Sequence, residues 1–266
     1  DRIDVTCIPT GIPLHRAMAE AALEAGTHVL VEKPAAGCVQ DVDAMIRARD
    51  LSGGLCAVGY QHIYGPDARR IKRWVCEGRL GRITRIRSFC CWPRNRAYYG
   101  RNGWAGRLAV GDTWVLDSPH NNALAHAVNA MCYLACDRPG ESVRPTAVRA
   151  ELYRANAIES ADTVAFRAST AEGPEIFFAM SHCTDRNVHP VTVIEGELGR
   201  VEWTYYGEIR VRWRDGGEEA FGQPDGPPRV AEDVAEVLLG KKRSLFCPID
   251  VARAQTLCVC GTFESS

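Results

Sequence analysis

Residues 28–34 read His28-Val29-Leu30-Val31-Glu32-Lys33-Pro34, and this stretch decides the fold. Residues 28–31 are typical of a short buried strand, which a charged pair and then a proline bring to an end. A strand is predicted at 3–8, ended by Pro9-Thr10-Gly11, with a helix at 14–25 between the two strands. Strand, helix and strand in this order form a βαβ unit with parallel strands. We therefore expect Lys33 at the carboxyl edge of a parallel sheet, where open α/β sheets bind their ligands.

The alternation of strand and helix continues to residue 82 and then changes. The fold class predicted is α/β, with part of a Rossmann-type doubly wound parallel sheet followed by an α+β domain with an open, mostly antiparallel sheet. We place the Rossmann half at 1–82 and the substrate-binding and oligomerisation domain at 83–266. The helices are expected at 39–51, 66–77, 117–136, 230–239 and 249–263, the last of them packing on the Rossmann part. The strands are expected at 55–59, 84–92, 147–154, 163–168, 175–181, 192–195, 200–205 and 209–213.

Composition excludes several classes of function. The 266 residues carry a formal net charge of -1, which gives no indication of nucleic-acid binding. No apolar run is long enough to cross a membrane. The twelve cysteines contain no C-x-x-C pair, so we predict no metal site and interpret them as buried free thiols of a cytoplasmic protein.

Two motifs lie at the predicted strand ends. Pro9-Thr10 ends the first strand, and backbone N–H groups in such a turn can bind a phosphate or ribose. His15 follows five residues after Thr10 in the sequence. The alternative is an ordinary turn with a surface histidine. The Lys33 ammonium, at the tip of a buried strand, could bind a substrate hydroxyl and stabilise it as its proton leaves. The alternative is a solvated lysine paired with Glu32.

The predicted helix 117–136 carries a third group. If it begins near Pro119, then Asn122, His126 and Asn129 lie at i, i+4 and i+7 and form one polar stripe. The opposite, core-facing stripe consists of Leu124, Val128 and Met131. With Asp117 at the helix start, the polar stripe could line a polyol pocket and transfer protons. The alternative is N-capping by Asp117 or Ser118 and a core histidine.

The aromatic and arginine-rich loop from Tyr98 to Trp104 is a fourth candidate. Its rings could line a cofactor or sugar pocket, or make a subunit contact.

In this order, the motifs resemble the Gfo/Idh/MocA family of glucose–fructose oxidoreductase and inositol dehydrogenase-like enzymes. The resemblance is carried by Cys7-Ile8-Pro9-Thr10 with His15, by residues 22–34 ending in Glu32-Lys33-Pro34, by Val58-Gly59-Tyr60-Gln61, by the Asp117 segment, and by residues 195–200 and 250–254. It implies NAD(P)-dependent hydride transfer to or from a sugar, polyol or related carbonyl compound. It also implies a homo-oligomer, a dimer or tetramer, formed through the sheet of the second domain.

The resemblance assigns roles to individual residues. Lys33 and Asp117 would be catalytic. The cofactor, NAD or NADP, would meet Pro9, Thr10, His15, Glu32, Lys33, Gln61 and Trp104. The substrate would meet Lys33, Tyr98, Asn121, Asn122 and His126. The family usually has a histidine four residues after the aspartate, where this chain has Asn121, so His126, His120 or Lys33 would transfer the proton.

A second departure is the absence of G-x-G-x-x-G, the glycine loop that binds the cofactor pyrophosphate. On this ground, and because the chain ends at 263–266 inside a predicted helix without a cap, it is interpreted as a fragment truncated at both ends. Such a fragment is expected to bind NAD(H) poorly by itself. The alternative function is a non-catalytic sugar-binding or assembly protein without its cofactor half. A hydrolase is a third reading, but the sequence has no nucleophile elbow.

Overall fold

The first part of the chain forms a three-stranded parallel sheet in the order β1-β2-β3. The structure is a computed structural model that describes residues 3–205, 207–222 and 229–266. The strands are β1 (Val5–Ile8), β2 (His28–Val31) and β3 (Cys56–Val58). Val5 pairs with His28 and Ile8 with Val31, so β1 and β2 end at the same edge of the sheet. The parallel sheet predicted around residues 28–34 is confirmed.

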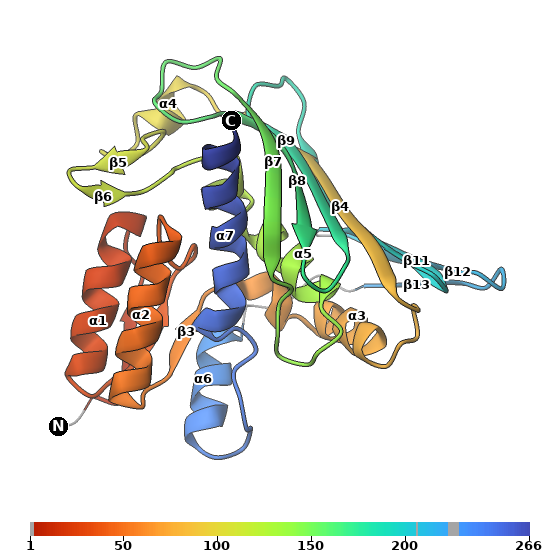
Figure 1. The fold of residues 1–266 in the computed structure, drawn as a ribbon, viewed down its shortest axis with the longest axis horizontal. Helices are drawn as coiled ribbons and strands as arrows, with labels where there is room; N and C mark the ends of the chain where they lie inside the picture. Colours follow the sequence, from red (N-terminus) through yellow and green to blue (C-terminus); the bar gives the residue numbers. More distant parts are fainter. Residues whose placement is uncertain (1–2, 206, 223–228) are drawn as a thin grey trace.

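Helices cover both faces of this sheet. On one face α1 (His15–Glu24) packs against α2 (Val39–Ser52) (Figure 1). Both helices are followed by a glycine with positive φ, Gly26 at 80° and Gly53 at 68°, a conformation that glycine adopts without steric cost. On the other face α6 (Val230–Leu238) packs its Val234 close to side chains of β1 and β2.

The second part of the chain forms an eight-stranded sheet in the order β13-β12-β11-β10-β4-β9-β8-β7. The adjacent inner strands β4 (Ile83–Cys91) and β9 (Glu175–Ser181) are parallel, and the other neighbouring strands are antiparallel. This confirms the predicted fold class. The remaining strands are β7 (Pro145–Tyr153), β8 (Thr163–Thr170), β10 (Val188–Gly196), β11 (Gly199–Thr204), β12 (Ile209–Trp213) and β13 (Glu218–Phe221).

Two helices connect the sheets. Every residue of α5 (Ala125–Ala135) is buried, because this helix contacts α3 (Pro66–Cys76), α7 (Ile249–Ser265), β4 and β10. α7 stands between α2 and β7 (Figure 1). Arg253 of α7 makes a two-pronged ion pair with Asp43 of α2, at 2.5 Å from Nε and 2.9 Å from Nη2.

Some local predictions are wrong. The expected helix 117–136 is a π-helical turn over Pro119–Ala123, then a break at Leu124, then α5. Leu124, Val128 and Met131 are buried as expected, but so is every other residue of α5, so the helix has no exposed polar face. The sequence did not indicate β5 (Ala109–Val110), β6 (Thr113–Trp114), β13, α4 (Arg96–Tyr99) or the 3₁₀ turns Ile12–Leu14 and Gln61–Tyr64. Within the described ranges, none of the helices has the length and apolar character needed to span a bilayer.

Candidate active site

His15 lies between the turns that follow β1 and β2 and contacts both. His15 is fully buried, with Nδ1 2.9 Å from the carbonyl oxygen of Pro34 and Nε2 3.0 Å from that of Thr10. The alternative of a surface histidine is therefore wrong. Both ring nitrogens already face carbonyl oxygens, so His15 positions the two turns and presents no polar atom to a cofactor. The hydroxyl oxygen of Thr10, by contrast, is buried without a hydrogen-bond partner in the described part of the chain.

Lys33 lies just beyond β2 and reaches across to the segment before α5. Its Nζ donates to the carbonyl oxygen of Asn122 at 2.9 Å and to the side-chain Oδ1 of Asn122 at 3.2 Å. Asn122 Nδ2 in turn donates to Asp117 Oδ1 at 2.8 Å. Among the described residues, Glu32 Oε2 accepts a hydrogen bond only from the backbone N–H of Lys33, at 3.2 Å. The alternative of a solvated lysine paired with Glu32 is therefore wrong.

Asp117 is held in a fixed position. The backbone N–H of Gly106 donates to Asp117 Oδ2 at 2.6 Å, and only 4% of Asp117 is exposed. The preceding residue, Leu116, has φ of 46°, a left-handed conformation that is rare for a residue with a Cβ. Such backbone outliers persist where surrounding contacts enforce them and cluster at functional sites. Lysine, amide and carboxylate thus form one continuous chain of hydrogen bonds.

Burial moves the pKa values of the two charged ends of this chain toward each other. Burial lowers the pKa of Lys33, and the nearby charges of Glu32 and Asp117 partly oppose that change. Burial raises the pKa of Asp117, although hydrogen bonds from Gly106 and Asn122 act in the opposite direction. Both shifts favour the neutral forms, so Lys33 gives up its proton more readily than a solvated lysine.

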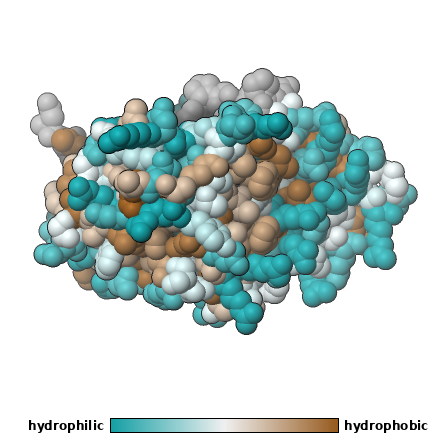
Figure 2. Space-filling model, turned by 90° about the horizontal axis from the view of Figure 1, so that it is seen from above, coloured by the Kyte–Doolittle hydropathy of each residue, from teal (hydrophilic) through white to brown (hydrophobic). Residues whose placement is uncertain are grey.

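The segment between α4 and Asp117 covers this edge of the sheet. Trp104 packs over Gly11, where a Cβ would lie only 2.8 Å from the indole Nε1. The backbone of Trp114 passes over Gly37, where a Cβ would lie 1.9 Å from the Trp114 carbonyl oxygen. Figure 1 shows the β5–β6 hairpin above α1 and α2. Figure 2 views the molecule from that side and shows apolar surface along the middle of the face, with hydrophilic surface around it.

Tyr98 lies in α4, just before this covering segment, and Arg101 belongs to the segment itself. The Arg101 guanidinium lies 3.7 Å from the ring centre of Tyr98 and 5.2 Å from that of Trp104. Burial raises the pKa of Tyr98, and the charge of Asp117 contributes to the rise. The predicted aromatic loop therefore lies close to the chain of hydrogen bonds that begins at Lys33.

Two imidazole rings lie beside Lys33. His126 is 9% exposed, and its ring centre is 4.5 Å from that of His62. The sequence gave no reason to select His62, which follows the predicted cofactor residue Gln61 in the 3₁₀ turn after β3. Burial, followed by the charge of Lys33, lowers the pKa of His62 to about 4. Burial also lowers the pKa of His126, with further contributions from His62 and Lys33. Both rings are therefore neutral near pH 7.

Two other predicted residues have structural contacts instead. His120 is fully buried, with Nε2 2.7 Å from Thr262 Oγ1 and its ring stacked on Phe263, so its contacts are with α7 and the core. Asn121 is also fully buried; its Nδ2 donates to the Val115 carbonyl oxygen and its Oδ1 accepts from Gln255. These contacts argue against His120 as the proton-transfer group and against Asn121 as a substrate contact.

The described residues contain no group of three or more His, Cys, Asp or Glu side chains placed to hold a metal ion. The site therefore has to be interpreted from its lysine, carboxylate, amides and imidazoles. These features define a class of protein. A half-buried lysine lies at the carboxyl end of a parallel strand, is connected to a buried carboxylate and is covered by an aromatic loop. The class is that of α/β proteins with a polar site at the strand ends of their parallel sheet, where doubly wound folds bind nucleotides.

Comparison with known proteins narrows this class. Residues 1–60 match the family model described as "Oxidoreductase family, NAD-binding Rossmann fold", the Gfo/Idh/MocA family. The fold agrees over most of the chain. Levoglucosan dehydrogenase, solved in complex with NADH, is similar with a TM-score of 0.83 at 20% identity, over 99% of this chain and 77% of that one. Over residues 1–60 the sequence is thus similar to the Gfo/Idh/MocA oxidoreductase family, and over most of the chain the fold is that of levoglucosan dehydrogenase.

Two curated relatives share parts of the sequence. 1-Carboxy-3-chloro-3,4-dihydroxycyclohexa-1,5-diene dehydrogenase from Comamonas testosteroni is 37% identical over 86 residues, 32% of this chain and 22% of that protein. 1,5-Anhydro-D-fructose reductase from Ensifer adhaerens is 35% identical over 146 residues, 53% of this chain and 40% of that protein. The chain thus matches less than half the length of either relative.

Proposed function

We propose that the complete gene product is an NAD(P)-dependent oxidoreductase that transfers a hydride to or from a sugar, polyol or related carbonyl compound. One observation carries the proposal: Lys33, at the carboxyl end of β2, is linked through Asn122 to the buried Asp117. The relatives named above are dehydrogenases and a reductase of sugar-like or cyclic diol compounds, which supports this substrate class. They do not favour the alternative of a non-catalytic sugar-binding or assembly protein.

The strand ends offer polar atoms that fit a nicotinamide cofactor. The unpartnered hydroxyl of Thr10 lies in the turn after β1, and Lys33 lies in the turn after β2. These residues would hold the ribose and nicotinamide end, with Pro9, Glu32, Gln61 and Trp104 around them. The bound nicotinamide would supply the acceptor or donor of the hydride.

Lys33 is the proposed proton-transfer group. With its pKa lowered by burial, neutral Lys33 can accept the proton of a substrate hydroxyl, and the ammonium can return it in the reverse direction. Asp117 stabilises the ammonium, and Asn122 holds the amine in place. Tyr98, Asn122 and His126 would contact the substrate. His126 is the weaker candidate base, because a second positive charge beside Lys33 is unfavourable.

The test is Lys33→Ala in the complete gene product, assayed against a panel of sugars and inositols with NAD and NADP. We expect kcat to fall by about 10²–10⁴, the usual contribution of a proton-transfer group. The matched control is Lys241→Ala, because Lys241 is exposed after α6. An unchanged kcat in Lys33→Ala would exclude this role for the lysine. His126→Ala, measured in parallel, shows whether the imidazole transfers the proton instead.

We further propose that residues 1–82 bind the cofactor and that residues 83–266 bind the substrate and form the subunit interface of a homo-oligomer. The outward face of the eight-stranded sheet supports the assembly. Val191, Phe89, Ala179 and Ala165 lie side by side across β10, β4, β9 and β8. Of these, Phe89 is 52% exposed, an unusual position for a phenylalanine in the middle of a sheet.

A further inference from the structure

A cavity of about 730 Å³ lies between α3, the loop after α5 and the segment 242–246. The proposed reaction does not use it, and its size is that of a small-molecule site. One wall is apolar, with Pro66, Pro139 and Leu245. The charged lining consists of four cationic side chains and one carboxylate, namely Arg69, Lys72, Arg73, Lys242 and Glu77. The cavity therefore combines an apolar wall with an excess of positive charge.

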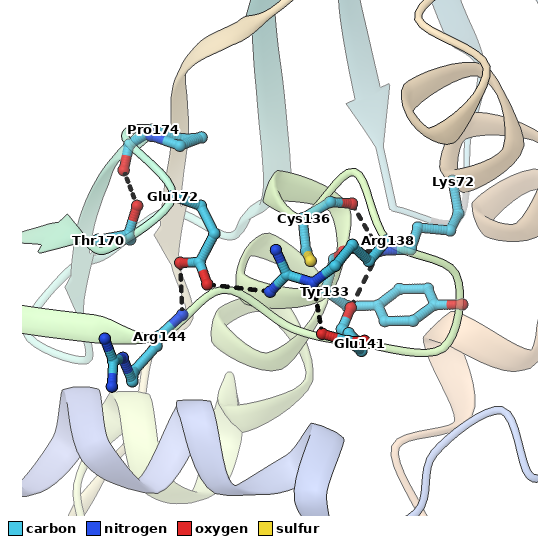
Figure 3. Close-up of polar contacts among 9 residues, drawn as sticks. All are labelled: Lys72, Tyr133, Cys136, Arg138, Glu141, Arg144, Thr170, Glu172 and Pro174. Carbon is cyan, nitrogen blue, oxygen red and sulfur yellow. Dashed lines mark hydrogen bonds and ion pairs between the residues drawn. The ribbon is translucent and has the colours of Figure 1, made fainter.

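The rim of this cavity is fixed by a buried lysine. Lys72, which is 4% exposed, donates from Nζ to the carbonyl oxygens of Tyr133 at 2.7 Å, Cys136 at 2.6 Å and Glu141 at 3.0 Å (Figure 3). On the outer side of the same loop, Arg138 Nε donates to the Glu141 side chain at 2.6 Å. The three Nζ donors are all used, so Lys72 holds the loop and contributes its charge without contacting a ligand directly.

Two arginines face the cavity without a carboxylate partner. Arg69 and Arg73 are one turn apart on α3. Within the described ranges neither makes an ion pair, whereas Arg70 of the same helix pairs with Glu219 at 3.2 Å. The Nε of Arg69 is buried without a hydrogen-bond partner there, and its guanidinium lies 4.9 Å from the ring centre of Phe246. These two guanidinium groups keep donors for an anion.

The remaining cation at the rim is already neutralised. Lys242 makes a very short contact with the carboxylate of Asp233 and lies over the ring of Phe246. The positive charge that is available for a ligand thus comes from Arg69 and Arg73.

We propose that this cavity binds a small phosphorylated metabolite, with its phosphate between Arg69 and Arg73 and its carbon skeleton against Pro66, Pro139 and Leu245. Guanidinium groups match phosphate oxygens with two parallel hydrogen bonds, which an ammonium cannot do. The apolar wall gives an organic phosphate an advantage over the inorganic ion. Pro139, in the loop held by Lys72, is fixed in this wall before any ligand arrives.

The test is isothermal titration calorimetry of the purified 266-residue chain with phenyl phosphate and with inorganic phosphate at low salt. We expect phenyl phosphate to bind at least tenfold more tightly than inorganic phosphate. The double variant Arg69→Gln/Arg73→Gln should weaken phenyl phosphate binding at least tenfold. The matched control is Arg210→Gln/Arg212→Gln, which removes the same charge from two exposed arginines of β12.

Three results would overturn the proposal. The first is no measurable binding of phenyl phosphate. The second is equal affinity for the two phosphates, which would indicate attraction of charge alone. The third is the same loss of affinity in the β12 control. A circular dichroism spectrum and a melting curve of each variant establish that a loss of affinity comes from the removed guanidinium groups in a folded protein.

Discussion

Asn122 is the residue on which the candidate active site depends. Its carbonyl oxygen and its Oδ1 both accept hydrogen bonds from Lys33, while its Nδ2 donates to Asp117. An amide suits this position because it carries a donor and an acceptor at once. A carboxylate there would repel Asp117, and an apolar side chain would leave the Asp117 oxygen unpaired in a buried site.

Burial, followed by the charges of Glu32 and Asp117, determines the pH at which Lys33 changes its protonation state. The Asp117 carboxylate raises the pKa of Lys33, against the larger lowering by burial. Removing it with Asp117→Asn lowers the pKa of Lys33 further. In the proposed direction of alcohol oxidation, we expect kcat/KM of the complete gene product to rise with pH as Lys33 loses its proton. We expect the inflection below the ordinary lysine range in the wild type and at still lower pH in Asp117→Asn.

The measurement is a pH profile of kcat/KM for both proteins. Asp112→Asn is the matched control, because Asp112 is exposed in the turn between β5 and β6. A profile that moves to higher pH in Asp117→Asn, or that moves equally in the control, would contradict the assignment of the inflection to Lys33.

At the scale of elements, Lys72 connects α3 to the end of α5. The last carbonyl groups of a helix have no partner within the helix, and Lys72 satisfies those of Tyr133 and Cys136. Lys72→Met keeps the aliphatic part of the side chain but removes all three hydrogen bonds. We expect the free energy of unfolding to fall by about 3 kcal/mol, because charged hydrogen bonds to buried carbonyls are lost.

Urea denaturation followed by circular dichroism measures this change. Lys241→Met is the control, and as a surface substitution it should change the free energy of unfolding by less than about 0.5 kcal/mol. Equal stability of Lys72→Met and the wild type would show that water replaces the ammonium at these carbonyls.

The regular elements could be predicted from the sequence because their signals are local. The apolar run 28–31 and the glycines that follow α1 and α2 depend only on neighbouring residues. The π-helical turn before α5 could not be predicted in this way, because Asn121 bonds Val115 on one side and Gln255, 134 residues away, on the other. Contacts with α7 therefore override the helical pattern that begins at Pro119.

The candidate site also contains some residues that the sequence could predict and some contacts that it could not. Lys33 could be selected from sequence, since a charged residue at the tip of a buried strand has no role in the core. The hydrogen bonds between Lys33 and Asn122 could not be predicted from the sequence, because 89 residues separate the two. His62 was missed because its neighbour His126 lies on another element, and neither ring carries a local sequence signal of the contact.

At the scale of the whole molecule, the two faces of the eight-stranded sheet differ. One face packs on α5, while the other carries the row of apolar side chains that crosses β10, β4, β9 and β8. Ion pairs flank that row, among them Arg87 with Glu195 at 3.0 Å and Arg85 with Glu175 at 3.1 Å. An apolar centre with a charged rim is the usual anatomy of a protein interface, and a two-fold axis through it would pair the row with itself.

We therefore expect the chain to sediment as an assembly larger than a monomer and Phe89→Glu to shift it to the monomer. A carboxylate in the middle of the row would be desolvated without a partner in the paired sheets, which is strongly unfavourable. Leu51→Glu is the matched control, because Leu51 is 90% exposed on α2, far from this face in the fold. Sedimentation velocity with all three proteins decides the question. A monomeric wild type, or a Phe89→Glu variant that assembles like Leu51→Glu, would show that this sheet face is not the interface.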